Sequence, residues 1–297
     1  MSFVIAQWES PGGGLARVIN EQAEKLVAEC QTAHEAPEVF AHKARVRCKK
    51  IRAALRLVEP LLGGKAYRRE NRWWRDAARE LSELRDMTAR IEALEALQPF
   101  LTARIGTAMM RRLNERFEKE RRAMNTADAI AAFRARIAER GAEFAPHLPH
   151  GDREEMAKAL SQTYREARRS MKAALKDQDP LLIHEWRKQT KYHALQTRLM
   201  RMTFPEMLQD RTGAARELAE LLGSVQDIEV VLESAKGWDD APDGFAEGLE
   251  ERRGTLIEDA AHAGGKLFAD KPKAWAARLL DPPAHQPLDR EEAEADL

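Results

Sequence analysis

The feature that most constrains this chain is an internal repeat of a cationic helical motif. Residues 42–56 read HKARVRCKKIRAALR, and residues 184–198 read HEWRKQTKYHALQTR. His, Arg, Lys and Arg recur in both segments at relative positions 0, 3, 7 and 14, with a separation of 142 residues (42 to 184). A second pair of segments ends in Asp86 and Asp227 and keeps nearly the same separation. Two blocks that share one separation predict a duplicated helical half-domain.

The composition favours helices throughout the chain. Of the 297 residues, 43% are hydrophobic, 33% are charged and only 6% are aromatic, which suits amphipathic helices and argues against an all-β protein. Breaks rich in Pro and Gly are expected to interrupt the helical periodicity at residues 11–14, 61–64, 141–151 and 203–205. The sequence therefore predicts an all-α protein of about eight to ten helices.

The break near the middle of the chain defines the expected domain organisation. Residues 15–285 are predicted to form one domain, made of a half-repeat at 15–145 and a second half-repeat at 152–285. The remaining residues, 286–297, form an acidic C-terminal tail. The shared separation predicts that the two half-repeats form two helical bundles related by an approximate two-fold axis.

The charges of the chain are strongly segregated although they cancel overall. The chain has 49 Lys and Arg against 49 Asp and Glu, so its net charge selects no partner. Residues 42–75 contain twelve basic and two acidic residues, and residues 164–201 contain ten basic and four acidic ones. Residues 227–262 restore the balance with eleven acidic and three basic residues. A fold that keeps these blocks apart carries a concentrated positive field.

In both motif segments the cations lie on one face of the helix. At about 100° per residue, each segment has one cationic stripe and one apolar stripe. The cationic stripes are His42, Arg45, Lys49, Arg52 and Arg56 in the first segment, and His184, Arg187, Lys191 and Arg198 in the second. Like charges on one helix face cost roughly 0.2–0.5 kcal/mol per pair. A solvated face is the alternative, but a polyanion that neutralises both stripes is the simplest compensation.

The duplicated H-x-x-R-x-x-x-K pattern, followed in each half by a helix ending in Arg-Asp or Gln-Asp, resembles the CHAD family, the conserved-histidine α-helical domain. The resemblance spans roughly residues 15–285. It implies two four-helix bundles with a basic groove or pore between them, binding of inorganic polyphosphate, and association with polyphosphate granules. By position it implies these ligands: His42, Arg45, Lys49, Lys50, Arg52, Arg56, His184, Arg187, Lys188, Lys191 and Arg198.

The two copies of the motif are not equivalent, and other stripes extend the candidate surface. The second copy has Tyr192 and Ala194 where the first copy has Lys50 and Arg52. We therefore expect the two halves to bind the phosphate chain with unequal strength. Further basic residues are candidates for additional binding: Arg72, Arg75, Arg79, Arg111, Arg112, Arg165, Arg168, Arg169 and Lys172. Each of these stripes is equally consistent with a solvated helix face.

Neither catalysis nor a metal site is expected. Some CHAD domains accompany a triphosphatase domain marked by an E-x-E-x-K strand, which this sequence lacks. The segment Gly264-Gly265-Lys266 is followed by Leu267, not by the Ser or Thr of a phosphate-binding loop. The eight histidines form no H-x-x-x-H pair with a third ligand nearby. We therefore expect a binding protein that needs no cofactor.

Two alternative functions stay open. A groove that recognises phosphate would also bind RNA or DNA weakly, with affinity that falls steeply as salt rises. The cationic stripes contain few side chains that read or stack bases, which argues against specific nucleic-acid recognition. A scaffold or adaptor role is the other alternative, and the sequence identifies no protein partner.

The remaining sequence features predict a cytoplasmic protein. The start, MSFVIAQWES, resembles no signal peptide, and no window approaches the length of a membrane span. The resemblance adds an expected association with polyphosphate granules. Cys30 and Cys48 form no metal-ligand pattern and are predicted to be buried thiols. His193 falls on the apolar side of its helix and is predicted to be a packed histidine.

Overall fold

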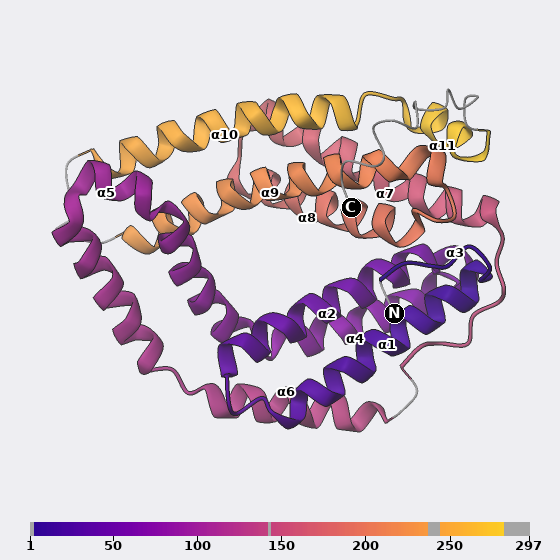
Figure 1. Ribbon diagram of the computed structural model, residues 1–297, viewed down its shortest axis with the longest axis horizontal. Helices are drawn as coiled ribbons and strands as arrows, with labels where there is room; N and C mark the ends of the chain where they lie inside the picture. The colour runs from indigo at the N-terminus through magenta and orange to yellow at the C-terminus, as the bar shows by residue number, and fades with distance from the viewer. Residues whose placement is uncertain (1–2, 142–143, 237–243, 282–297) are drawn as a thin grey trace, which may run out of the picture.

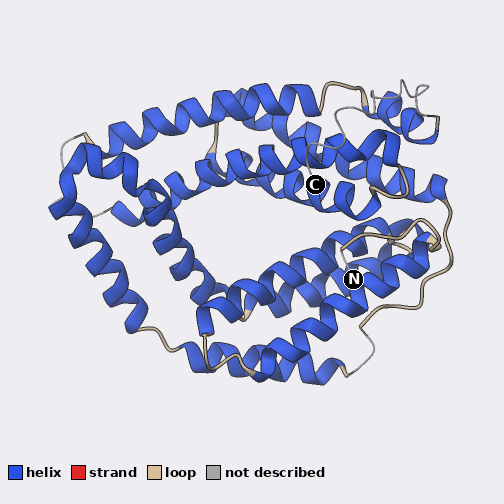
Figure 2. Cartoon of the chain, viewed as in Figure 1, coloured by secondary structure: helices blue, strands red, loops and turns tan. Residues whose placement is uncertain are grey.

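A computed structural model describes residues 3–141, 144–236 and 244–281 of the chain, and these residues form eleven helices and no strand. The expected all-α class is therefore confirmed (Figure 2). The acidic tail at 286–297 lies outside the described residues. The helices are α1 (Pro11–Gln31), α2 (Pro37–Leu57), α3 (Glu59–Leu62), α4 (Gly64–Arg79), α5 (Ser82–Arg122), α6 (Thr126–Arg140), α7 (Arg153–Asp177), α8 (Pro180–Met200), α9 (Pro205–Ala235), α10 (Phe245–Leu267) and α11 (Pro272–Leu280).

The helices form two layers that are joined by α5. In the lower layer of Figure 1, α2 packs against α1, α4 and α6, and in the upper layer α8 packs against α7 and α9. The helix α10 covers α9, and α11 covers α7. The long α5 leaves the first layer and packs against α9 of the second. The two motif helices, α2 and α8, contact each other between the layers.

The apolar faces of the motif helices build the core. On α2, Ala44, Cys48, Ile51 and Leu55 are fully buried, as the predicted apolar stripe requires. On α8, Trp186 is fully buried. Both helices begin with a proline at the first position, where no intrahelical partner is needed for the missing N–H. The cationic stripes consequently face away from the core that fixes each helix.

The PGGG segment at 11–14 does not interrupt a helix as expected, because it begins α1. Ser10 caps the helix by accepting a hydrogen bond from the Gly13 N–H at 3.2 Å. The Gly12 N–H donates to the His150 carbonyl at 2.7 Å, and a Cβ at position 12 would lie 1.8 Å from the Pro149 carbonyl oxygen. The missing side chain thus lets the segment between the halves lie against the start of α1.

A turn inside α5 was not predicted. Gly106 has φ of 78° and ψ of 162°, a conformation that glycine adopts easily, and the helical chain changes direction there. The residues before and after Gly106 form two arms, and an ion pair of 3.7 Å joins Arg90 on one arm to Glu120 on the other. A single glycine without a neighbouring proline gave too weak a signal for this break.

His193 and both cysteines occupy the buried positions that the sequence predicts. His193 is fully buried among Tyr164, Phe268 and Trp275, with ring centroids 5.5–5.8 Å away. Burial lowers its pKa well below the usual value, with a further contribution from the charge of Arg211. Cys30 and Cys48 are free buried thiols. These residues are part of the core.

Two adjacent glycines of α10 give a test of the packing. A Cβ at Gly264 would lie 2.8 Å from Met171 Sδ and 3.0 Å from Trp186 Cζ2, whereas nothing lies within 4 Å of a Cβ at Gly265. We expect Gly264→Ala to lower the free energy of unfolding by about 1–3 kcal/mol through overpacking. Gly265→Ala should leave it unchanged or raise it by up to about 1 kcal/mol. Urea unfolding measures both, and equal effects would contradict the close contact.

Candidate functional site

Cations from both halves of the chain meet where α2, α5 and α8 come together. The positive charge of Lys191 on α8 lowers the pKa of Lys49 on α2, and the charge of Arg187 on α8 adds to this effect. Arg85 on α5 acts on the same residues and on His42. We call this group the cation cluster: His42, Arg45, Lys49, Arg85, Arg187 and Lys191. It brings together the centres of the two predicted stripes.

The two lysines of the cation cluster have strongly lowered pKa values. Desolvation lowers the pKa of Lys49 to about 7, and the positive charges of Lys191 and Arg45 contribute. Desolvation likewise lowers the pKa of Lys191 to about 8, with Arg187 as the next cause. Lys49 reaches solvent, but the protein and the cations that surround it disfavour its charge. Desolvation and the charge of Arg85 also lower the pKa of His42.

The corresponding arginines of the two motifs, Arg45 and Arg187, are alike in the burial of their Nε atoms. Among the described residues, the buried Nε atoms of Arg45 and Arg187 have no hydrogen-bond partner. Arg45 does use Nη1, which donates to the Ala78 carbonyl at 2.8 Å at the end of α4. A buried donor without an acceptor is costly, and the buried Nε atoms of Arg56 and Arg140 carry the same cost, so this feature does not by itself mark an anion site.

The two aspartates that close the repeat influence these arginines from a distance. Asp86 raises the pKa of Arg45, and Asp227 raises that of Arg187, but burial outweighs both effects. In the described part of the chain, neither aspartate makes a direct ion pair with its arginine. Each half therefore places a carboxylate near its arginine without neutralising it by contact.

Arg85 belongs to the site but was missed as a binding residue in the sequence. It is half-buried, and its Nη1 donates to Glu92 Oε2 at 2.7 Å, seven residues further along α5. The position that corresponds to Arg85 in the second half is Gln226. Its Oε1 lies 2.7 Å from His184 Nδ1. The only sequence signal was its place directly before Asp86, since it has no part in a cationic stripe.

A cavity of about 190 Å³ lies beside the cation cluster, on the side of the first half. We call it the α2–α4 cavity. Its lining consists of Arg45, Cys48, Lys49, Arg52, Arg75, Ala78, Arg79 and Ser82. Arg45, Lys49 and Arg52 come from α2, and Arg75 and Arg79 come from α4. Two groups that the sequence treated separately, the first stripe and an additional stripe, therefore share one cavity.

Several other predicted residues lie away from the cluster or have protein partners. Arg56 pairs with Glu166 on α7 at 2.9 Å and stacks over Tyr192 at 4.2 Å, so it joins the two halves. Lys188 pairs with Glu185 within its own helix. Lys50 lies over the Phe3 ring at 5.4 Å. Desolvation, followed by the charges of Arg198, Arg47 and Lys25, lowers the pKa of Lys50, so Lys50 lies near Arg198.

The additional basic residues divide into three groups. Arg75 and Arg79 line the α2–α4 cavity. Arg168 donates from Nε to the Phe268 carbonyl at 2.9 Å and so caps the end of α10. The others are exposed on helix surfaces: Arg72, Arg111, Arg112, Arg165, Arg169 and Lys172.

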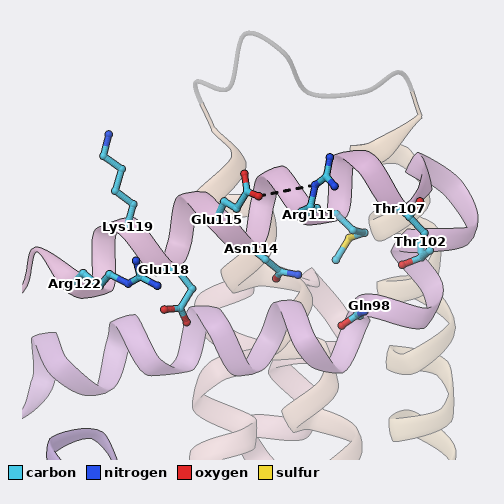
Figure 3. Close-up of a pocket in the computed structure, with 10 residues that line it drawn as sticks. Gln98, Thr102, Thr107, Arg111, Asn114, Glu115, Glu118, Lys119 and Arg122 are labelled. Carbon is cyan, nitrogen blue, oxygen red and sulfur yellow. Dashed lines mark ion pairs between the residues drawn. The ribbon is translucent and has the colours of Figure 1, made fainter.

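A second cavity, of about 590 Å³, lies between the two arms of α5 (Figure 3). Arg111, Asn114 and Glu118 of one arm lie along it, with Gln98 and Thr102 on the other arm. Arg111 is engaged with Glu115 at 3.9 Å. Its lining mixes amides, hydroxyls and both signs of charge, so it lacks the excess of cations found near α2.

The described residues contain neither a candidate metal site nor a candidate membrane span. In this part of the chain, no group of three or more His, Cys, Asp and Glu side chains is arranged to hold a metal ion. None of the described helices combines the length and apolar character needed to cross a membrane.

Comparisons with known proteins place the chain in a wider context. A family model described as CHAD domain matches residues 17–236. Among solved structures, PptA from Streptomyces chartreusis is similar at 17% sequence identity with a TM-score of 0.50. That match covers 90% of this chain and 98% of the PptA chain. At this identity the likeness shows the fold alone. No curated protein sequence matches significantly.

The lowered pKa of Lys49 predicts a pH dependence of stability. An ordinary lysine titrates at 10.5, whereas Lys49 in the fold titrates at about 7. Between these values the unfolded state binds more protons, so the free energy of unfolding rises with pH, and this contribution is lost as the pH falls to about 7. We expect Lys49→Met to remove that rise, measured by urea unfolding between about pH 6 and about pH 9.

Lys43→Met is the matched control, because Lys43 is exposed on the same helix outside the cation cluster. It should leave the pH profile of the wild type unchanged. A Lys49→Met profile that is parallel to the wild-type profile would contradict the crowding of charge around this lysine.

Proposed function

Because this chain belongs to the CHAD family, we propose that it binds inorganic polyphosphate through the cation cluster and does not catalyse a reaction on it. The observation that carries this proposal is the meeting of cations from α2, α5 and α8. A cytoplasmic location, with association to polyphosphate granules, is part of the same proposal. The binding of a polyanion accounts for a cluster that the protein alone leaves with unrelieved repulsion.

The chemistry of the ligand suits this cluster. Polyphosphate is a flexible chain with about one negative charge per internal unit and no base or sugar to recognise. Its phosphoryl oxygens accept charge-assisted hydrogen bonds from arginine and lysine, which supports their placement among the side chains of the cation cluster. Bound anions favour the protonated forms of Lys49 and Lys191, so binding should strengthen as the pH falls.

Nucleic-acid backbone binding is the competing function. Phosphodiesters would also be attracted to the cluster, and their binding would fall with salt. The lining of the α2–α4 cavity contains no aromatic side chain on which a base could stack. This favours an unadorned phosphate chain. Single-stranded RNA that competes as well as polyphosphate at equal charge would reverse the preference.

Replacing the two central lysines tests the proposal. We expect Lys49→Gln combined with Lys191→Gln to weaken binding of long-chain polyphosphate at least about tenfold, because two charge-assisted contacts are lost. The slope of log affinity against log salt is negative, and it should become shallower by about 1.4. This is about 0.7 for each lost contact if polyphosphate behaves like a single strand. Calorimetric titrations at several salt concentrations measure both quantities.

A second double variant controls for the change in overall charge. Lys43→Gln with Lys176→Gln removes the same charge from exposed positions on α2 and α7. Its affinity should stay close to that of the wild type. Equal losses in the two double variants would mean that general charge, and not the cluster, attracts the ligand.

A further inference from the structure

We propose that the α2–α4 cavity binds a terminal phosphate group, so that the first half of the protein holds the end of a phosphate chain. This inference rests on the proposed function and deepens it by naming the part of the ligand that one cavity takes. The same chemistry is offered by the end of a long polyphosphate and by a small compound such as pyrophosphate, and the experiment below separates these sources.

The cavity concentrates cations in a small space. Five of its eight lining residues are basic, and none is acidic: Arg45, Lys49, Arg52, Arg75 and Arg79 are joined by Cys48, Ala78 and Ser82. An internal phosphate unit carries one charge, whereas a terminal phosphate group, like a phosphate monoester, carries about 1.5–2 at neutral pH and has three strong acceptor oxygens. The number of donors in this cavity therefore suits a chain end better than an internal unit.

The cavity lies at a corner of the fold. Residues of α2 form one wall, Arg75, Ala78 and Arg79 form another near the end of α4, and Ser82 closes the corner at the start of α5. Arg45 ties these walls together, because its Nη1 contacts the Ala78 carbonyl at 2.8 Å and Ser82 Oγ at 3.4 Å. A chain that enters such a corner presents its end to the walls.

The basic side chains are only weakly committed to protein partners. Arg52 donates to the neutral amide oxygen of Asn71 at 2.9 Å. Arg75 pairs with its exposed neighbour Asp76 at 2.8 Å, and such a surface pair contributes little. Burial raises the pKa of the Cys48 thiol to about 12, so this residue places no negative charge against an anion.

The positions of the second half that correspond to Arg52, Arg75 and Arg79 have lost two of these three cations and gained an acidic residue. The separation of 141 residues that relates Asp86 to Asp227 relates Arg75 to Arg216 and Arg79 to Glu220. Arg216 and Glu220 form an ion pair of 2.8 Å with each other. The position of Arg52 is taken by Ala194 in the motif repeat. The three positions thus carry three positive charges in the first half, whereas in the second half the charges of Arg216 and Glu220 cancel and Ala194 is neutral, so the second half is less suited to hold a chain end.

The experiment compares ligands with and without free ends. Short polyphosphate of one length is prepared with free termini or with both termini capped by a neutral amine, and its binding to the full chain is measured by calorimetry. The wild type should prefer the free-ended form about tenfold, the effect of about one charge-assisted hydrogen bond. In Arg75→Ala/Arg79→Ala this preference should disappear.

The matched control is Lys65→Ala/Arg68→Ala, which removes two exposed basic residues of the same helix that do not line the cavity. It should keep the preference of the wild type for free ends. Equal affinity of the wild type for capped and free-ended chains would overturn the inference, as would a preference that survives in Arg75→Ala/Arg79→Ala. Strong binding of the capped chain would at the same time uphold the proposed function.

Pyrophosphate distinguishes the two sources of a terminal phosphate. If the cavity serves chain ends, pyrophosphate should bind the wild type much more weakly than the free-ended chain, which also contacts the cation cluster. Pyrophosphate that binds as tightly as the chain, and is lost in Arg75→Ala/Arg79→Ala, would support the cavity as a site for small phosphates. Failure of every phosphate to bind would overturn both the inference and the proposed function.

Discussion

The fold is organised around positive charges that it holds close together against their mutual repulsion. Cations of α2, α5 and α8 lower the pKa of Lys49 and of Lys191, while Asp86 and Asp227 stay out of direct contact with the arginines. The opposite faces of α2 and α8 are buried in the core, where Trp186 is fully enclosed. Apolar packing thus stabilises an arrangement that electrostatics opposes, and the polyanion that we propose as ligand would relieve the repulsion.

The halves of the protein are related in pattern and unequal in charge. The first has Arg52, Arg75 and Arg79 around one cavity, whereas the second has Ala194, Arg216 and Glu220 at the corresponding positions. Under the proposed function, the cation cluster would bind any phosphate unit along a chain. In addition, the α2–α4 cavity of the first half would bind the terminal phosphate group of the polyphosphate chain. If only the first half holds a chain end, the bound polyphosphate chain would run from the α2–α4 cavity towards the second half.

The sequence was informative where the structure depends on short-range periodicity. Buried Cys48 and Ile51, and the cations on the other face of α2, follow from a repeat of about 3.6 residues per turn. Arg85 could not be found in this way, because α5 brings it to the cluster from another part of the chain. The turn at Gly106 rests on one backbone conformation, and the start of α1 at residues 11–14 rests on a contact with residues 149–150.

The most direct test of the shared cation cluster is the number of protons taken up when polyphosphate binds. Calorimetric titration at about pH 8, in two buffers with different ionisation enthalpies, measures this number. With pKa values of about 7 for Lys49 and about 8 for Lys191 in the free protein, binding should take up about one proton or more per site. Tight binding without proton uptake would contradict the account, because it would mean that the ligand lies elsewhere on the protein.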